Sequence, residues 1–134
     1  MARFVVVALA LSLALAGTAA GAGVQSGKLV TYVHSGGFTG DRDTLTVFRS
    51  GRADSSNGLF GLTTKRRLSL ERALRAARFA TLRKEYVPVD PVADGYIERI
   101  SYAGRTVSVA QGATPPARLQ RVLTLLADLL ARKR

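Results

Sequence analysis

The hydrophobic and polar residues of this chain follow two periods, a two-residue alternation typical of strands and a three-to-four-residue repeat typical of helices. Segments rich in β-branched and aromatic residues, separated by glycine and serine turns, predict strands in the first half of the chain. They cover Lys28 to His34, Thr44 to Arg49, a short return at Ala53 to Ser55 and an extended piece at Leu62 to Leu68.

A first helix is predicted to begin at Ser69, whose side chain suits an N-cap. Leu70, Ala73, Leu74 and Ala77 then recur at helical spacing and define a core-facing side. Proline residues later in the segment Tyr86 to Asp94 predict a loop there.

The second half predicts a hairpin and a last helix. Tyr96 to Tyr102 and Arg105 to Val109 flank the pair Ala103-Gly104, which suits a tight turn. Thr114 is the expected cap of the last helix, with Pro115 and Pro116 in its opening turn. Its apolar positions form the strongest pattern in the chain: Leu119, Val122, Leu123, Leu126, Leu129 and Leu130.

This order of strands, helix, hairpin and helix predicts an α+β fold. We expect a small antiparallel sheet of four to five strands with two helices packed on one face. The 134 residues suit one such domain.

Residues 1–22 are expected to be a signal peptide. Arg3 precedes a thirteen-residue apolar run from Phe4 to Ala16, too short for a permanent membrane span, and Ala20-Gly21-Ala22 fits a cleavage site. A buried N-terminal helix is the alternative interpretation. Cleavage after Ala22 leaves residues 23–134 as a single secreted, periplasmic or cell-envelope domain. It also lowers the net charge from +11 to +10, since one arginine and no acid is lost.

The residue types give little support to an enzyme. The chain has no cysteine, which excludes disulfides, thiolate nucleophiles and lipid attachment at a cysteine. His34 is the only histidine, and we interpret it as a solvent-facing residue near a strand end rather than a general base. The acid pairs Asp41 with Asp43 and Asp90 with Asp94 lie in predicted loops and lack the ligand density of a calcium site. We therefore expect no catalytic residues, no metal and no cofactor.

The glycine-rich segment between the first two strands is the candidate recognition loop. It lacks the lysine and following helix of a phosphate-binding loop, so its simplest interpretation is a turn. The functional interpretation places Phe38 exposed at its tip, whereas the alternative folds Phe38 back under the sheet. The residues of this loop are Ser35, Gly36, Gly37, Phe38, Thr39 and Gly40.

Basic residues suggest a second kind of partner. They lack the interleaved aromatic residues of a single-strand binder, and an exported protein rarely meets nucleic acid, so no nucleic-acid partner is expected. A solvated cationic surface is the simplest interpretation, and contact with an acidic polymer or acidic protein is the alternative. The candidate polyanion contacts are Lys65, Arg66, Arg67, Arg72, Arg75 and Arg78.

Several short motifs spread over nearly all of residues 23–134 resemble one known family. They are Ser35-Gly36-Gly37-Phe38-Thr39-Gly40, Asp43-Thr44-Leu45-Thr46-Val47, Leu68-Ser69, Ala77-Arg78-Phe79, Tyr96, Tyr102, Gly104-Arg105-Thr106-Val107, and Gly112-Ala113-Thr114-Pro115-Pro116 with Leu119, Leu123 and Leu126. In these positions the chain resembles the emfourin or protealysin-inhibitor-like proteins, although the stretch from Asn57 to Thr64 fits that pattern poorly and the simplest members lack a signal peptide.

The resemblance implies a small α+β inhibitor of thermolysin-like zinc metalloproteases that blocks the active-site cleft and catalyses nothing itself. On physical grounds the loop around Phe38 is our candidate protease contact, because a bulky exposed side chain held between two strands suits an apolar specificity pocket. Pro88 to Asp94 is the alternative loop. The competing function is a cationic binding module for acidic envelope polymers or an acidic protein partner.

Overall fold

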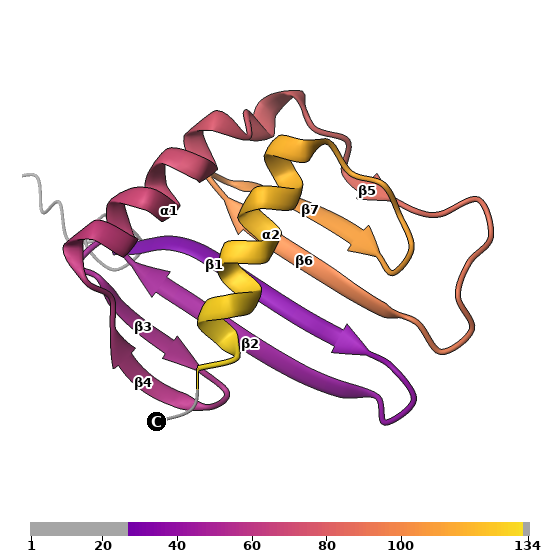
Figure 1. Ribbon diagram of the computed structural model, residues 1–134, viewed down its shortest axis with the longest axis horizontal. Coiled ribbons are helices and arrows are strands. Elements are labelled where there is room, and N and C mark those ends of the chain that lie inside the picture. The colour runs from indigo at the N-terminus through magenta and orange to yellow at the C-terminus, as the bar shows by residue number, and fades with distance from the viewer. Residues whose placement is uncertain (1–26, 133–134) are drawn as a thin grey trace, which may run out of the picture.

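The computed structural model describes residues 27–132, and these form an α+β fold with two helices and a seven-stranded, mostly antiparallel open sheet (Figure 1). The strand order across the sheet is β4-β3-β2-β1-β6-β7-β5, and only the β5–β7 pair is parallel. The strands are β1 (Lys28–Gly36), β2 (Asp41–Phe48), β3 (Arg52–Ser55), β4 (Gly58–Gly61), β5 (Glu85–Tyr86), β6 (Tyr96–Tyr102) and β7 (Arg105–Ala110). The helices are α1 (Thr64–Ala76), the short 3₁₀ helix η1 (Phe79–Thr81) and α2 (Ala117–Leu130).

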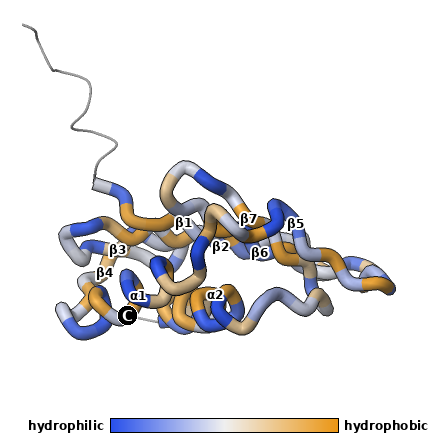
Figure 2. Tube along the Cα trace, turned by 90° about the horizontal axis from the view of Figure 1, so that it is seen from above, coloured by the Kyte–Doolittle hydropathy of each residue, from blue (hydrophilic) through white to orange (hydrophobic). Residues whose placement is uncertain are grey.

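Both α-helices lie on the same side of the sheet (Figure 2). Residues of each strand point alternately to the two faces of the sheet, and the apolar ones lie on the face that the helices cover. In β1, Tyr32 lies opposite Leu45 of β2 and Ile100 of β6, and all three side chains are buried. The last helix contributes the six apolar residues that its spacing singles out, and all six are buried as predicted. The core therefore lies between the helices and this face.

The β6–β7 hairpin forms where the sequence predicts it. Ala103 and Gly104 both adopt positive φ, at 51° and 76°, which is the backbone of a type I′ turn. The strands on either side are paired from Tyr102 with Arg105 to Ile97 with Ala110. The turn residues and the alternating pattern of the two strands thus both favour the hairpin that is observed.

The sheet has seven strands, so the expected four to five was wrong. The difference lies in two short edge strands. β4 pairs with β3 at one edge, and β5 contributes only Glu85 and Tyr86, which lie beside Ser108 and Val109 of β7 at the other. Strands this short have no alternation to detect in a sequence. Tyr86, expected in a loop, is therefore the end of a strand.

Both helix starts differ from the prediction. The first helix begins five residues before Ser69, and Thr63 is its N-cap, with its hydroxyl oxygen accepting a hydrogen bond from the Arg66 amide at 3.3 Å. The extended piece predicted at Leu62 to Leu68 is thus mostly helix. The last helix begins at Ala117, so Thr114 does not cap it. Pro116 holds the N-cap position in an extended conformation, which a fixed proline φ permits.

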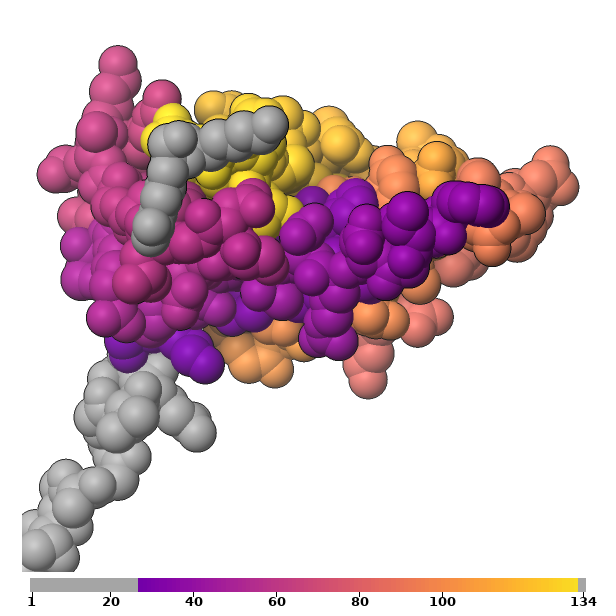
Figure 3. Space-filling view, turned by 90° about the horizontal axis from the view of Figure 1, so that it is seen from below, coloured from indigo at the N-terminus to yellow at the C-terminus, as the bar shows by residue number. Residues whose placement is uncertain are grey.

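The sheet extends beyond the helices at one end. There the turn between β1 and β2 and the segment from Val87 to Gly95 meet, and the molecule narrows towards them (Figure 3). We call residues 36–40 and 87–95 the tip. Residues 1–22, the expected signal peptide, lie outside the described residues. Within the described part of the chain, neither helix has the length and apolar character that crossing a membrane requires.

Candidate functional site

Most of the large apolar side chains exposed to solvent lie at the tip. Of the five such side chains among residues 27–132, only Leu59 lies elsewhere, on the edge strand β4. Phe38 is 94% exposed and Val89 is 97% exposed, and Val87 and Val92 accompany them. Scattered single apolar residues are normal on a protein surface, but four on two adjoining segments make the tip a candidate contact surface.

The β1–β2 turn holds Phe38 away from the body of the protein. The Gly40 amide donates to the Gly37 carbonyl at 3.0 Å, which closes the turn. The Thr39 hydroxyl donates to Asp41 Oδ2 at 2.5 Å and ties the turn to the start of β2. Phe38 therefore does not fold back under the sheet, and its projection is set by hydrogen bonds on both sides.

The second segment of the tip is fastened directly to the first. The Gly37 amide donates to the Gly95 carbonyl at 3.4 Å, and the Gly95 amide donates to the Val92 carbonyl at 3.1 Å. The approach at Gly36 is so close that a Cβ atom there would lie 2.7 Å from the Gly95 oxygen. Gly36, with φ of 105°, is thus the residue that permits the two segments to adjoin.

A shallow apolar depression lies beside the second segment. It has a volume of about 210 Å³ and is lined by Val87, Pro88, Pro91, Val92, Gly95, Tyr96, Ile97, Ala110 and Gln111. The Gln111 side chain accepts a hydrogen bond from the Tyr96 amide at 3.3 Å and so links β7 to the start of β6 behind it. The tip therefore offers both projecting apolar groups and a small hollow for an apolar group of a partner.

The tip and the strand ends behind it are acidic, in contrast to the basic chain as a whole. Residues 35–43 and 87–98 hold one basic residue, Arg42, and five carboxylates, namely Asp41, Asp43, Asp90, Asp94 and Glu98. Asp41, Asp90 and Asp94 are exposed. Their negative potential favours a partner surface that carries positive charge.

His34 lies behind the tip in a polar cluster on the helix-facing side of the sheet. Its ring stacks on Tyr96 with centroids 4.7 Å apart, and its neighbours across the strands are Asp43 and Glu98. It is half-buried rather than solvent-facing, because Tyr96 covers one side of the ring. Between residues 27 and 132 no hydroxyl is hydrogen-bonded to His34, and no cluster of three or more acids and histidines suited to a metal ion is found.

Tyr32 supports this cluster from below. Its hydroxyl donates to Glu98 Oε1 at 2.5 Å. Burial raises the pKa of the Tyr32 phenol far above its usual value, and the hydrogen bond to Glu98 raises it further. The phenol therefore stays protonated at physiological pH and acts as a structural donor.

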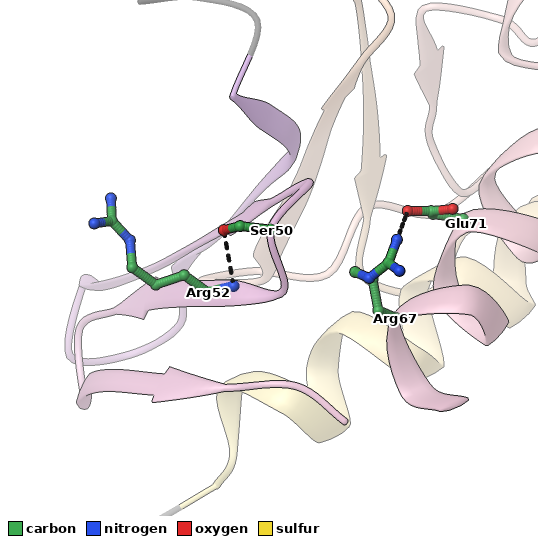
Figure 4. Close-up of polar contacts among 4 residues, drawn as sticks. All are labelled: Ser50, Arg52, Arg67 and Glu71. Atoms are coloured by element: carbon green, nitrogen blue, oxygen red, sulfur yellow. Dashed lines mark hydrogen bonds and ion pairs between the residues drawn. The ribbon is translucent and has the colours of Figure 1, made fainter. Parts of the chain in front are cut away.

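The six predicted polyanion contacts do not line one common depression. Arg67 donates to Glu71 Oε1 at 2.7 Å, one turn along α1, and is half-buried (Figure 4). Arg78 follows the helix with φ of 52°. Arg66 and Arg72 line depressions between α1 and α2, whereas Lys65 and Arg75 are exposed on α1 without lining either depression.

Sequence reasoning missed two arginines that adjoin Arg72 in the structure. Arg118 and Arg121, in the first turns of α2, line the same depression. Their spacing of three residues on the polar side of an amphipathic helix was visible in the sequence. The sequence does not show that the packing of the two helices brings them beside Arg72, which lies 46 positions before Arg118 and 49 before Arg121.

Comparison with known proteins adds no family assignment. No family model matches this chain, and no curated protein matches it by sequence.

Proposed function

We propose that this protein is an exported, non-enzymatic inhibitor of thermolysin-like zinc metalloproteases, and that its tip blocks the active-site cleft. The observation that carries the proposal is the tip itself, where Phe38 is 94% exposed on a turn fixed by hydrogen bonds. The resemblance to emfourin-like proteins supplies the class of target.

The shape of the tip suits insertion into a cleft. Two segments held together at Gly37 and Gly95 form one narrow end of the molecule (Figure 3). Both segments carry exposed apolar residues. A rigid projecting group loses little conformational freedom on binding, so more of its contact energy appears as affinity. Phe38 is therefore the expected anchor, and Val89 the second contact.

The charge around the tip suits the same target class. A catalytic zinc ion gives the cleft of a metalloprotease local positive charge. The exposed carboxylates of Asp90 and Asp94 lie within the tip, and that of Asp41 directly follows it in the chain. They favour approach to such a cleft and disfavour approach to an acidic one.

The test measures cleavage of a short chromogenic peptide by a panel of thermolysin-like proteases with and without the purified protein. We expect inhibition at micromolar concentration or below. Phe38→Ala should weaken inhibition by about 30-fold, the equivalent of a 2 kcal/mol binding hot spot. Leu59→Ala removes a side chain that is 56% exposed far from the tip and should leave inhibition unchanged.

Two results contradict the proposal. A panel left untouched by micromolar protein removes the inhibitor function. Equal inhibition by the wild type and Phe38→Ala removes the tip as the contact, provided that both proteins give the same circular dichroism spectrum.

A further inference from the structure

The outer surface of the helix layer carries a charge opposite to that of the tip. The two α-helices contain two acids, Glu71 and Asp128, and seven basic residues, namely Lys65, Arg66, Arg67, Arg72, Arg75, Arg118 and Arg121. Glu71 is already paired with Arg67. The remaining cations therefore face solvent with little compensation from carboxylates on the same helices.

Four of these cations, namely Arg66, Arg72, Arg118 and Arg121, line two depressions between the helices. One depression, of about 550 Å³, lies between α1 and the first turns of α2 and is lined by Arg72, Ala73, Ala76, Ala117, Arg118 and Arg121. A second, of about 260 Å³, lies further along and is lined by Arg66, Ser69, Leu70, Leu125, Asp128, Leu129 and Arg132. The helices α1 and α2 are neighbours on one side of the sheet (Figure 1). We call the arginines that line the two depressions the helix seam: Arg66, Arg72, Arg118, Arg121 and Arg132.

Small side chains make the first depression accessible. Three of its six lining residues are alanines, Ala73, Ala76 and Ala117, whose short side chains fill little space between the helices, and the other three are arginines. No ion pair involves Arg72 or Arg121 within residues 27–132. A planar guanidinium binds phosphate and carboxylate groups in a bidentate manner, so this rim suits either group.

Arg118 fixes the geometry of the rim. Its Nε donates to the Ala77 carbonyl at 2.9 Å, and one terminal nitrogen donates to Thr81 Oγ1 at 3.2 Å. A cation at the carbonyl end of α1 is favourable, because that end carries partial negative charge. Arg118 is thus held in place and positions a positive charge beside Arg72 and Arg121.

The extent of the helix seam distinguishes a polymer from a small ion. The fourteen residues of α2 span about 21 Å, and arginines stand near both ends of that length. One phosphate or carboxylate reaches a single depression. A chain of such groups reaches both and adds a contact with each arginine.

We infer that the helix seam binds a linear polyanion whose charges are phosphate or carboxylate groups, on a surface separate from the tip. The inference is independent of the protease-inhibitor proposal. A protein with both surfaces remains attached to an acidic polymer through its helices while its tip stays free.

The experiment titrates fluorescently labelled long-chain polyphosphate and poly-L-glutamate with the purified full-length protein at several salt concentrations. We compare Arg72→Gln/Arg121→Gln with Arg49→Gln/Arg99→Gln, which removes the same charge from exposed positions away from the helix seam. Arg118 is kept, because its hydrogen bonds join the two helices. Orthophosphate is tested as a competitor.

We expect the helix-seam variant to bind at least tenfold more weakly at low salt. Its plot of log affinity against log salt should be less steep by one to two units, because two ionic contacts are lost. The matched variant should change affinity less than threefold. Tighter binding of polyphosphate or of polyglutamate identifies the preferred group, and either result supports the inference.

Three results overturn the inference: no binding to either polymer, equal weakening in both variants, or displacement by orthophosphate at concentrations matched in phosphate groups. Protease inhibition is measured in parallel and should be the same for the helix-seam variant and the wild type. If Phe38→Ala loses inhibition but still binds the polymer, then the tip and the helix seam act independently. Each proposal can therefore be tested without the other.

Discussion

The two ends of the central strands differ in almost every property. Under the helices, β1, β2 and β6 present Tyr32, Leu45 and Ile100, all buried. At the other end the same strands pass into the tip, where Phe38 is exposed. Continuous strands thus hold a recognition surface in place without burying it. Substitutions under the helices should therefore change the free energy of unfolding, whereas substitutions at the tip should change binding.

The largest effect on stability is expected from Leu126→Ala. Leu126 is fully buried in α2, and its replacement leaves a cavity between the helix and the sheet. We expect a loss of about 3 to 5 kcal/mol, measured by urea unfolding. Leu125→Ala, one position along on the half-buried side, should cost clearly less. Equal costs at the two positions would contradict the assignment of the core face.

Gly36→Ala tests the place where the strands pass into the tip. The added Cβ lies 2.7 Å from the Gly95 carbonyl oxygen, and φ is 105°. We expect a loss of about 2 to 3 kcal/mol in unfolding free energy, together with weaker protease inhibition, because the two segments must separate.

Gly40→Ala is the matched change for this test. Gly40 also has positive φ, at 66°, but its Cβ would meet nothing within 4 Å. The Gly40→Ala variant should lose only about 1 kcal/mol in unfolding free energy. It should inhibit the protease as well as the wild type does. If the two variants behave alike, contact between the segments does not shape the tip.

Tyr32→Phe probes the boundary between the two ends. It removes the donor to Glu98 and should cost about 1 to 2 kcal/mol near pH 8. Because the folded state raises the pKa of Tyr32, its stabilising contribution is complete below about pH 10 and falls as the pH rises. Where unfolding releases one additional proton, the free energy of unfolding falls by about 1.4 kcal/mol for each pH unit.

The stability difference between wild type and Tyr32→Phe should therefore shrink by about 1 kcal/mol between pH 10 and pH 11, because the unfolded tyrosine is already half ionised at pH 10. Urea unfolding at pH 8, 10 and 11 measures it. A difference that stays constant over this range means that Tyr32 ionises equally well in the folded and unfolded chains.

At the end of the sheet that lies under the helices, the sequence predicted correctly those elements that have a clear hydrophobic periodicity. The six apolar residues of α2 and the Ala103-Gly104 hairpin were correct, because local pattern and tertiary packing favour the same structure there. The predicted start of α1 was wrong. Thr63 and Ser69 both suit an N-cap, and only the surrounding fold selects Thr63. The parallel contact of β5 with β7 joins residues far apart in the chain and leaves no local signal.

The tip was only half predictable. A glycine-rich turn between two strands predicted a projecting loop, and Phe38 is exposed there. The second segment was identified as a loop from its prolines, but its place beside Phe38 follows from the pairing of Gly36 with Tyr96. That pairing depends on the order of strands in the sheet, as the meeting of Arg72 with Arg121 depends on the packing of the helices.

The smallest effect on stability is expected from Phe38→Ala. A large aromatic residue usually contributes several kcal/mol to a core, and its loss there is among the costliest substitutions. Phe38 is 94% exposed and contributes no such burial, so the free energy of unfolding should change by less than about 0.5 kcal/mol. Thermal and urea unfolding measure this, with Phe79→Ala as the comparison, since Phe79 is buried against Tyr102 with ring centroids 5.2 Å apart. A Phe38 variant as unstable as the Phe79 variant would show that Phe38 packs against the protein in solution. Stability and recognition would then not be separate at the tip.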